Sequence, residues 1–190
     1  MYNAYKDVRN AVWQTLIDCS IITLPIPLKS IVGHFRAKLM DNDKVNILRD
    51  NQLGCLAVMN DELYIVLDRS VSIQRQRYTI AHEIGHIALG HNLNGVTLNR
   101  DNVIIYADVQ EYQAERFAID ILAPACVLWG LNLHTAEEIA KVCGISMSSA
   151  QRRAERMEIL YQRNMFLSHP LERQVFNQFQ KFISENKKTV

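Results

Sequence analysis

Two histidines and a glutamate occupy the short segment His82-Glu83-Ile84-Gly85-His86. Residues four positions apart lie one above the other on a helix, so the imidazoles of His82 and His86 can bind one metal ion. Glu83 would lie beside that ion without binding it, where its carboxylate can take a proton from water and pass it to a leaving amine. The residue types and their spacing predict a zinc site for hydrolysis, with Glu83 as the general base.

The helical phase of this segment separates the two histidines from the nearby isoleucines. At about 100° per residue, the isoleucines fall on the side of the helix opposite to His82. They are Ile73, Ile80, Ile84 and Ile87. Histidines that only fill the core would be expected within this apolar stripe. The phase therefore favours a metal site over a pair of core histidines.

A third protein ligand is expected from a second amphipathic helix, predicted from residue 111 to about residue 122. A catalytic zinc site takes three protein ligands and keeps one position for water. Glu111 and Glu115 fall on the apolar face of this helix, where an unpaired carboxylate is costly and where a metal and a histidine would offset that cost. Glu111 fits as the third zinc ligand, and Glu115 fits as the acceptor that orients a ligating imidazole. The polar face holds Gln113, Arg116 and Asp120.

Other side chains near these motifs are weaker candidates. One or both carboxylates could instead pair with Arg75 or Arg77 at the edge of the helix. His91 does not fit as a zinc ligand, because the extended pattern H-E-x-x-H-x-x-G-x-x-H needs glycine at position 89 and histidine at position 92, where this chain has leucine and asparagine. Tyr106 and Tyr112 are candidates for stabilising the oxyanion of the reaction, and neither can be assigned from the sequence.

The two motifs occur together along the chain. Residues 77–86 read Arg-Tyr-Thr-Ile-Ala-His-Glu-Ile-Gly-His, and residues 111–124 follow the pattern E-x-x-A-x-x-F-A-x-x-I-L-x-P. This pair resembles the ImmA/IrrE family of metallopeptidases, and the resemblance covers about residues 20–160. Two departures from the family pattern are mild: Tyr78 stands where phenylalanine is usual, and Ala123 stands where methionine often precedes the proline.

The resemblance implies a compact gluzincin-like peptidase, encoded by mobile elements or stress regulons, that cleaves a DNA-binding repressor. It matches His82, His86 and Glu111 to the zinc ligands and Glu83 to the general base. Gln113 stands where many family members have a second glutamate, which leaves Glu111 less ambiguous as the ligand.

The composition fits one globular domain of ordinary size, with room for a small appendage. Of the 190 residues, 48% are hydrophobic and 22% are charged, which is enough apolar material for a real core. The 21 basic and 20 acidic residues leave a net charge of +1, so no global field marks a protein that binds nucleic acid or a membrane surface. Any contact with nucleic acid would have to be local.

The cysteines and the N-terminus favour a cytoplasmic protein. The four cysteines lie far apart without C-x-x-C spacing, which is typical of reduced, buried thiols. They are Cys19, Cys55, Cys126 and Cys143. The N-terminal segment Met1 to Val8 is polar and charged, and no apolar run approaches the ~20 residues of a membrane span. We expect a soluble protein with no membrane partner.

The remaining patterns predict a mostly helical α+β fold of the zincin type with a small antiparallel sheet. Apolar residues at helical spacing predict a first helix over residues 4–19, whereas the polar stretch 38–51 is expected to be irregular. Apolar runs at 54–58 and 63–67 predict a β-hairpin, whose free edge could accept an extended peptide or whose strands could simply cover the core. A short strand is possible at 103–106.

The C-terminal third resembles a helix-turn-helix. Thr135 and Glu138 form a capping box that opens a helix ending near Gly144, and Ser146 can cap a second helix. A last amphipathic helix is predicted after Pro170.

Three arginines on the second of these helices allow two interpretations. They are Arg152, Arg153 and Arg156. They could contact DNA, although Arg153 stands where a core apolar residue is expected. A basic cluster on a neutral chain is usually a solvated face, so a helical module that packs on the peptidase or docks the substrate is favoured.

These inferences combine into one functional hypothesis and one alternative. We expect a zinc metallopeptidase core over residues 1–130, a helix-turn-helix-like segment over 131–165, and a C-terminal amphipathic helix and tail over 166–190. The expected function is a zinc-dependent endopeptidase that cleaves a protein substrate, foremost a helix-turn-helix repressor of a mobile element or stress regulon. The alternative is a transcription-regulatory or antitoxin-like binding module with a structural or inactive metal site.

Overall fold

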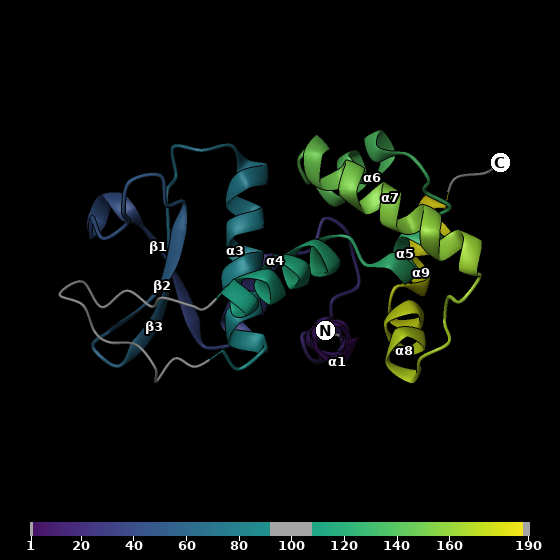
Figure 1. Ribbon diagram of the computed structural model, residues 1–190, viewed down its shortest axis with the longest axis horizontal. Coiled ribbons are helices and arrows are strands. Elements are labelled where there is room, and N and C mark those ends of the chain that lie inside the picture. The colour runs from purple at the N-terminus through teal and green to yellow at the C-terminus, as the bar shows by residue number, and fades with distance from the viewer. Residues whose placement is uncertain (1, 92–107, 188–190) are drawn as a thin grey trace. The chain divides into compact units, whose positions relative to one another are not determined.

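The computed structural model describes residues 2–91 and 108–187, and for residues 2–5 it describes the backbone alone (Figure 1). The chain divides into two compact units. The first comprises Met1–Val8 and Leu28–Ala118, and the second comprises Arg9–Pro27 and Ile119–Val190. Two helices, α1 (Tyr2–Asp18) and α4 (Asp108–Leu122), contribute residues to both units. The domain boundaries expected from the sequence stay a prediction.

The first unit contains a three-stranded sheet. Its strands are β1 (Ala37–Asp41), β2 (Gly54–Met59) and β3 (Glu62–Leu67), and β3 lies in the middle. The predicted hairpin is confirmed, because β2 pairs antiparallel with β3 along its whole length. Asn60 and Asp61 form the two-residue turn, and both have a positive φ, as the type I′ turn of a tight hairpin requires.

Strand β1 corrects the expectation that residues 38–51 are irregular. This strand pairs parallel with β3, which makes the sheet mixed rather than antiparallel. Only Ala37 of β1 is buried, so the strand carries no apolar run from which it could be predicted. A short 3-10 helix, η1 (Asn42–Lys44), follows it. The strand forms because a distant segment offers backbone hydrogen bonds, which local hydrophobicity does not reveal.

Helix α3 (Ile73–Ala88) carries the H-E-x-x-H segment and packs against β2, β3 and α2 (Leu28–His34) (Figure 1). Ile80 and Ile84 are buried, as the helical phase predicts, but Ile73 at the first position of the helix is 65% exposed. His86 is buried as well, so α3 is covered on its histidine side as well as on its isoleucine side. Fully buried side chains of this unit include Ile31, Leu56, Ile65, Leu67 and Phe117.

The second unit is helical in the part of the chain that the structure describes. Besides most of α1 and the end of α4, it contains α5 (Ala125–Gly130), α6 (Ala136–Cys143), α7 (Met147–Arg163), α8 (Pro170–Gln178) and α9 (Gln180–Asn186). The capping box of Thr135 and Glu138 is confirmed, and Ser146 caps α7 as predicted. The single helix predicted after Pro170 is two helices that meet at Phe179. The expected α+β, mostly helical fold is confirmed.

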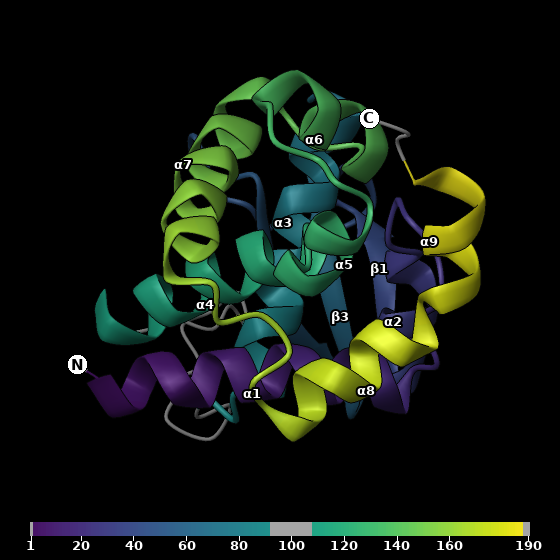
Figure 2. The same cartoon turned by 90° about the vertical axis from the view of Figure 1, so that its right-hand side faces the viewer.

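Within this unit, α1 and α8 run side by side (Figure 2). The side-chain amide of Gln178 donates to the backbone carbonyls of Leu16 and Ile21. The ring of Trp13 stacks on that of His169, with the ring centroids 4.9 Å apart. These contacts join the start of the helical unit to its end.

Arg153 is buried in this unit rather than exposed to DNA. It is 3% exposed, and its guanidinium donates to the carboxylate of Asp120, which is 6% exposed. The interpretation of Arg153 as a DNA contact and the placement of Asp120 on the polar face of its helix are therefore wrong. Helical phase is counted within one helix, whereas this ion pair joins residues 33 positions apart on α4 and α7.

Two further expectations concern membranes and thiols. Within the described ranges, every helix is either too short or too polar to span a bilayer. The four cysteines are free, and three of them are buried: Cys55, Cys126 and Cys143. The expectation of unpaired, largely buried thiols is confirmed.

Candidate metal centre

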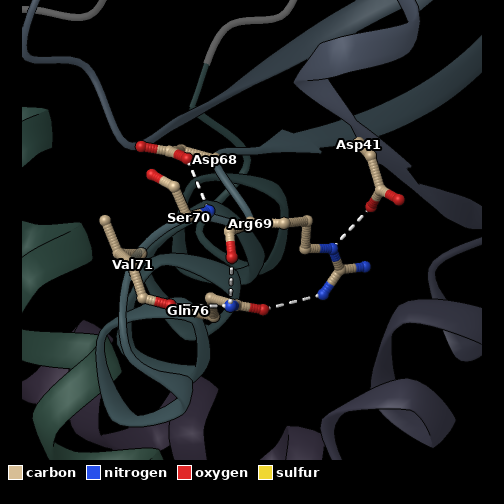
Figure 3. A network of polar contacts seen from close by, with 6 residues as sticks. All are labelled: Asp41, Asp68, Arg69, Ser70, Val71 and Gln76. Carbon is tan, nitrogen blue, oxygen red and sulfur yellow. Dashed lines mark hydrogen bonds and ion pairs between the residues drawn. The ribbon is translucent and has the colours of Figure 1, made fainter.

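The start of α3 is fixed by a network of polar contacts in the first unit (Figure 3). Arg69, in the loop before the helix, donates from Nη1 to Oε1 of Gln76 at 2.9 Å and from Nε to Asp41 on β1. Gln76 in turn donates to the backbone carbonyls of Arg69 and Val71. The Ser72 hydroxyl caps the helix by accepting a backbone N–H from its first turn. The loop, the edge strand and the helix that carries the motif are thereby held in one arrangement.

Three side chains converge between α3 and the first turn of α4, as the sequence predicts for a metal site. The Nε2 atoms of His82 and His86 lie 3.1 Å apart. Glu111 places one carboxylate oxygen 3.2 Å from Nε2 of His82 and the other 3.6 Å from Nε2 of His86. Among residues 2–91 and 108–187, these three form the one group of three or more such side chains that could hold a metal ion.

The spacing of these donor atoms fits a tetrahedral zinc ion. Zinc binds imidazole nitrogen and carboxylate oxygen at about 2.0–2.2 Å, which places neighbouring ligand atoms of a tetrahedron about 3.3 Å apart. The two Nε2 atoms, 3.1 Å apart, and the Glu111 oxygen that lies 3.2 Å from Nε2 of His82 are close to that value, and the other oxygen of the same carboxylate lies 3.6 Å from Nε2 of His86. Two imidazoles and one carboxylate also leave the fourth position open, as a catalytic site requires.

Both histidines are in the protonation state that a metal requires. Burial lowers the pKa of His82 to about 4, with a smaller contribution from His91. Burial, with smaller contributions from His82 and His91, lowers the pKa of His86 to about 2. Near neutral pH both imidazoles are therefore uncharged, and each has one ring nitrogen with a free lone pair.

Glu83 lies beside this cluster and is 5% exposed. Its carboxylate accepts a hydrogen bond from the backbone N–H of Leu56 on β2. Burial, together with the neighbouring carboxylate of Glu111, raises the pKa of Glu83 to about 8. A cation held by Glu111 and the histidines would favour the ionised form of Glu83. A divalent cation in this cluster would therefore keep the buried carboxylate of Glu83 ionised, the form that can accept a proton.

A small pocket of about 210 Å³ opens beside His82 and Glu83. Its wall includes Tyr78, whose ring centroid lies 6.5 Å from that of His82. Glu115 also lines this pocket, together with the residues at the start of β2. Among the strands that the structure describes, β2 lies at an edge of the sheet, so the pocket lies next to that edge.

Some predicted residues lie differently from expectation. The Glu111 side chain is 45% exposed and Glu115 is exposed, so neither carboxylate is as buried as the helical phase predicts. The orienting role of Glu115 stays a prediction. Tyr112 is 66% exposed and does not line the pocket, whereas Tyr106 and the possible strand 103–106 lie outside the described residues.

His91 and Gln113 are polar residues near the site to which the sequence reasoning gave no role. Nδ1 of His91 lies 3.0 Å from Nδ1 of His86, and Nε2 of His91 lies 3.1 Å from Oε1 of Gln113. His91 follows Gly90, whose φ of 64° ends the helix and turns the chain back toward His86. The sequence signal that could have revealed this contact is a histidine directly after a glycine that ends the helix, because such a glycine turns the next residue back toward the last turn.

Gly85 is the other residue that the sequence reasoning passed over. A Cβ at this position would lie 3.1 Å from the Cα of Ala114 and 3.1 Å from the Cβ of Phe117. The glycine therefore lets α3 and α4 approach closely, which brings Glu111 to the histidines. The sequence signal that could have revealed this close approach is the pair of small residues, Gly85 in the first motif and Ala114 in the second.

One comparison with known protein families gives a match that includes the residues of this site. A search of curated proteins found no match. A family model, Peptidase M78, described as the IrrE N-terminal-like domain, matches residues 35–155. The match includes the whole H-E-x-x-H segment and Glu111, and it extends over more than half of the sequence. The chain therefore belongs to the Peptidase M78 family, in agreement with the resemblance of its two motifs.

Proposed function

We propose that this protein is a zinc-dependent endopeptidase. Membership of a peptidase family supports a metallopeptidase-type function. The observation that carries the proposal is the set of donor atoms from His82, His86 and Glu111, whose spacing suits a tetrahedral zinc ion. The buried carboxylate of Glu83 beside them supports hydrolysis rather than a purely structural metal site.

Each residue has a defined role in this proposal. His82, His86 and Glu111 hold the ion, which when bound supplies Lewis acidity to a substrate carbonyl and to water. Glu83 accepts a proton from the attacking water at its carboxylate and delivers that proton to the nitrogen of the leaving amine. The N–H of Leu56 keeps the carboxylate in place between these two proton transfers.

The metal assignment is tested by elemental analysis of purified variants. Wild-type protein should carry about one zinc per chain, and Glu111→Ala should lose most of it because two imidazoles alone bind zinc weakly. Glu83→Gln should keep the zinc and lose peptidase activity. Glu155→Gln, a change on the exposed face of α7, is the matched control and should behave like wild type. Full zinc occupancy in Glu111→Ala would move the third ligand elsewhere.

We further propose a protein substrate in the cytoplasm, specifically a helix-turn-helix repressor of a mobile element or stress regulon. This part rests on the resemblance of the two motifs to the ImmA/IrrE family. The Glu83→Gln protein should retain such a substrate from its own cell extract, where mass spectrometry identifies it. Recovery of other proteins, and cleavage of those proteins by wild type, would contradict the repressor proposal.

The alternative of a DNA-binding regulatory module has less support. Arg153 is buried against Asp120, and the exposed residues of α7 include Glu155 and Glu158 as well as Arg152. This mixture of charges does not form the basic face that phosphate contacts require. Retardation of duplex DNA with a steep salt dependence, and no proteolysis that a chelator stops, would favour the alternative.

A further inference from the structure

On the side of His86 that faces away from the proposed metal position, a second histidine and a glutamine form a chain of hydrogen-bond contacts, from His86 to His91 and from His91 to Gln113. Nε2 of His86 faces His82 and Glu111, whereas its Nδ1 lies 3.0 Å from Nδ1 of His91. Nε2 of His91 lies 3.1 Å from Oε1 of Gln113. His86 is 1% exposed and His91 is 6% exposed, so these contacts form largely out of reach of water.

The direction of these hydrogen bonds follows from the chemistry of the groups. The amide oxygen of Gln113 can only accept, so Nε2 of His91 carries the proton. A neutral imidazole has one N–H, so Nδ1 of His91 is an acceptor and the proton between the two Nδ1 atoms belongs to His86. The Nε2 of His86 then has its lone pair directed toward the other two ligands.

The reverse direction is incompatible with metal binding. It would need the amide nitrogen of Gln113 to face His91, and each imidazole would then carry its proton on the other nitrogen. The proton of His86 would lie on Nε2, among the three ligand atoms, where it would exclude a cation. One tautomer of His86 therefore suits the metal, and the side chains behind it supply the acceptor for that tautomer.

We propose that His91 and Gln113 are positioning residues, which hold His86 in the tautomer and ring orientation needed for metal binding. This inference rests on the proposed metal site. A carboxylate or a backbone carbonyl commonly accepts the second N–H of a metal-bound histidine. Here a neutral imidazole takes that place, and it is itself oriented by an amide. Gln113 follows Glu111 by two positions on α4, so one helix supplies both the third ligand and the end of the positioning contacts.

The test compares variants that remove the acceptor with variants that keep it. His91→Leu removes the acceptor, and zinc affinity should fall about 10–100-fold, the range for loss of such a partner. His91→Asn can place an amide oxygen near the position of Nδ1 and should recover most of the affinity. Gln113→Leu should weaken zinc binding several-fold, whereas Gln113→Glu, which can only accept at its ionised carboxylate, should bind zinc at least as tightly as wild type. His34→Leu, at an exposed histidine of α2, is the matched control and should leave affinity unchanged.

The readouts are direct measures of the metal site. Zinc dissociation constants come from competition with a chromophoric chelator of known affinity, and the visible spectrum of the Co²⁺-loaded protein reports ligand geometry. Metal-free His91→Leu is first checked by thermal unfolding. If that variant does not fold, the comparison of Gln113→Leu with Gln113→Glu decides.

Three results would overturn the inference. Wild-type affinity in folded His91→Leu would show that His86 needs no acceptor. Equal losses in His91→Asn and His91→Leu, or in Gln113→Glu and Gln113→Leu, would show that hydrogen bonding is not the cause. Failure of wild-type protein to bind zinc, with no effect of Glu111→Ala, would instead overturn the metal site itself and this inference with it.

Discussion

Replacing Gly85 with alanine tests how closely α3 and α4 must approach to form the proposed metal site. The added Cβ would lie 3.1 Å from the Cα of Ala114 and 3.2 Å from its carbonyl oxygen. These are backbone atoms, which cannot rotate away, so α4 must move by a few tenths of an ångström. Alanine gains about 1 kcal/mol of helix propensity over glycine, whereas overpacking of this kind costs about 1–3 kcal/mol. We expect a net loss of stability of about 0–2 kcal/mol.

The same movement should weaken metal binding. Glu111 lies one turn before Ala114 on α4, so its carboxylate moves with the helix away from the two histidines. Metal sites tolerate deviations of only about 0.2 Å in their ligand distances. A shift of a few tenths of an ångström should therefore reduce zinc affinity about tenfold, which corresponds to about 1.4 kcal/mol.

Two measurements separate these effects. Urea unfolding in the presence of a chelator gives the stability of the metal-free protein, and chelator competition gives the zinc dissociation constant. Gly33→Ala is the matched control, because a Cβ at that exposed position of α2 would meet no atom within 4 Å. It should be as stable as wild type or up to about 1 kcal/mol more stable, with unchanged zinc affinity. The reasoning would be refuted if Gly85→Ala gained stability and bound zinc as tightly as wild type.

Three further predictions concern pH, thiols and the buried ion pair. In metal-free protein, the free energy of unfolding should rise from pH 4 to about 6.5, because the unfolded chain protonates the motif histidines, whose folded pKa values burial lowers. Between about pH 6.5 and 8 it should then fall, by at most about 1.4 kcal/mol per pH unit, because Glu83 is ionised in the unfolded chain but stays protonated in the folded protein, where burial raises its pKa to about 8. Urea unfolding with chelator checks this, and Glu83→Gln should abolish the fall. Burial raises the pKa of the Cys55 and Cys126 thiols to about 12, so neither thiol should react with iodoacetamide at pH 8 in the folded protein. Both should react in urea, and mass spectrometry of the labelled protein checks this. Asp120→Ala leaves the buried charge of Arg153 unpaired and should lower the free energy of unfolding, measured in urea, by about 3–5 kcal/mol. The double variant Asp120→Leu with Arg153→Met should recover most of this loss. An equal loss of stability in the single and the double variant would contradict the ion-pair account.

The sequence alone determined the features that depend on neighbours a few residues apart. The spacing of His82 and His86 acts through one turn of helix, so the pair could be predicted to share a face. The hairpin and the capping box of Thr135 are likewise local, because their hydrogen bonds join segments that follow one another directly. Glu111 was predicted as the third ligand because a second local pattern marked its helix and because a catalytic zinc site needs three protein ligands, and the structure places its carboxylate beside both histidines.

Only the tertiary structure decided the features that depend on contacts between distant segments. Strand β1 forms by pairing with β3 and has no apolar pattern of its own. The sequence placed Arg153 at a core position of its helix, but the buried carboxylate that pairs with it, Asp120, lies 33 positions away on another helix. His91 contacts Gln113, which lies 22 positions further along the chain. Because of this contact His91, which the sequence excluded as a metal ligand, becomes a candidate for orienting the proposed ligand His86. Secondary-structure propensity and helical phase depend on residues a few positions apart, whereas contacts between distant segments depend on how the whole unit packs.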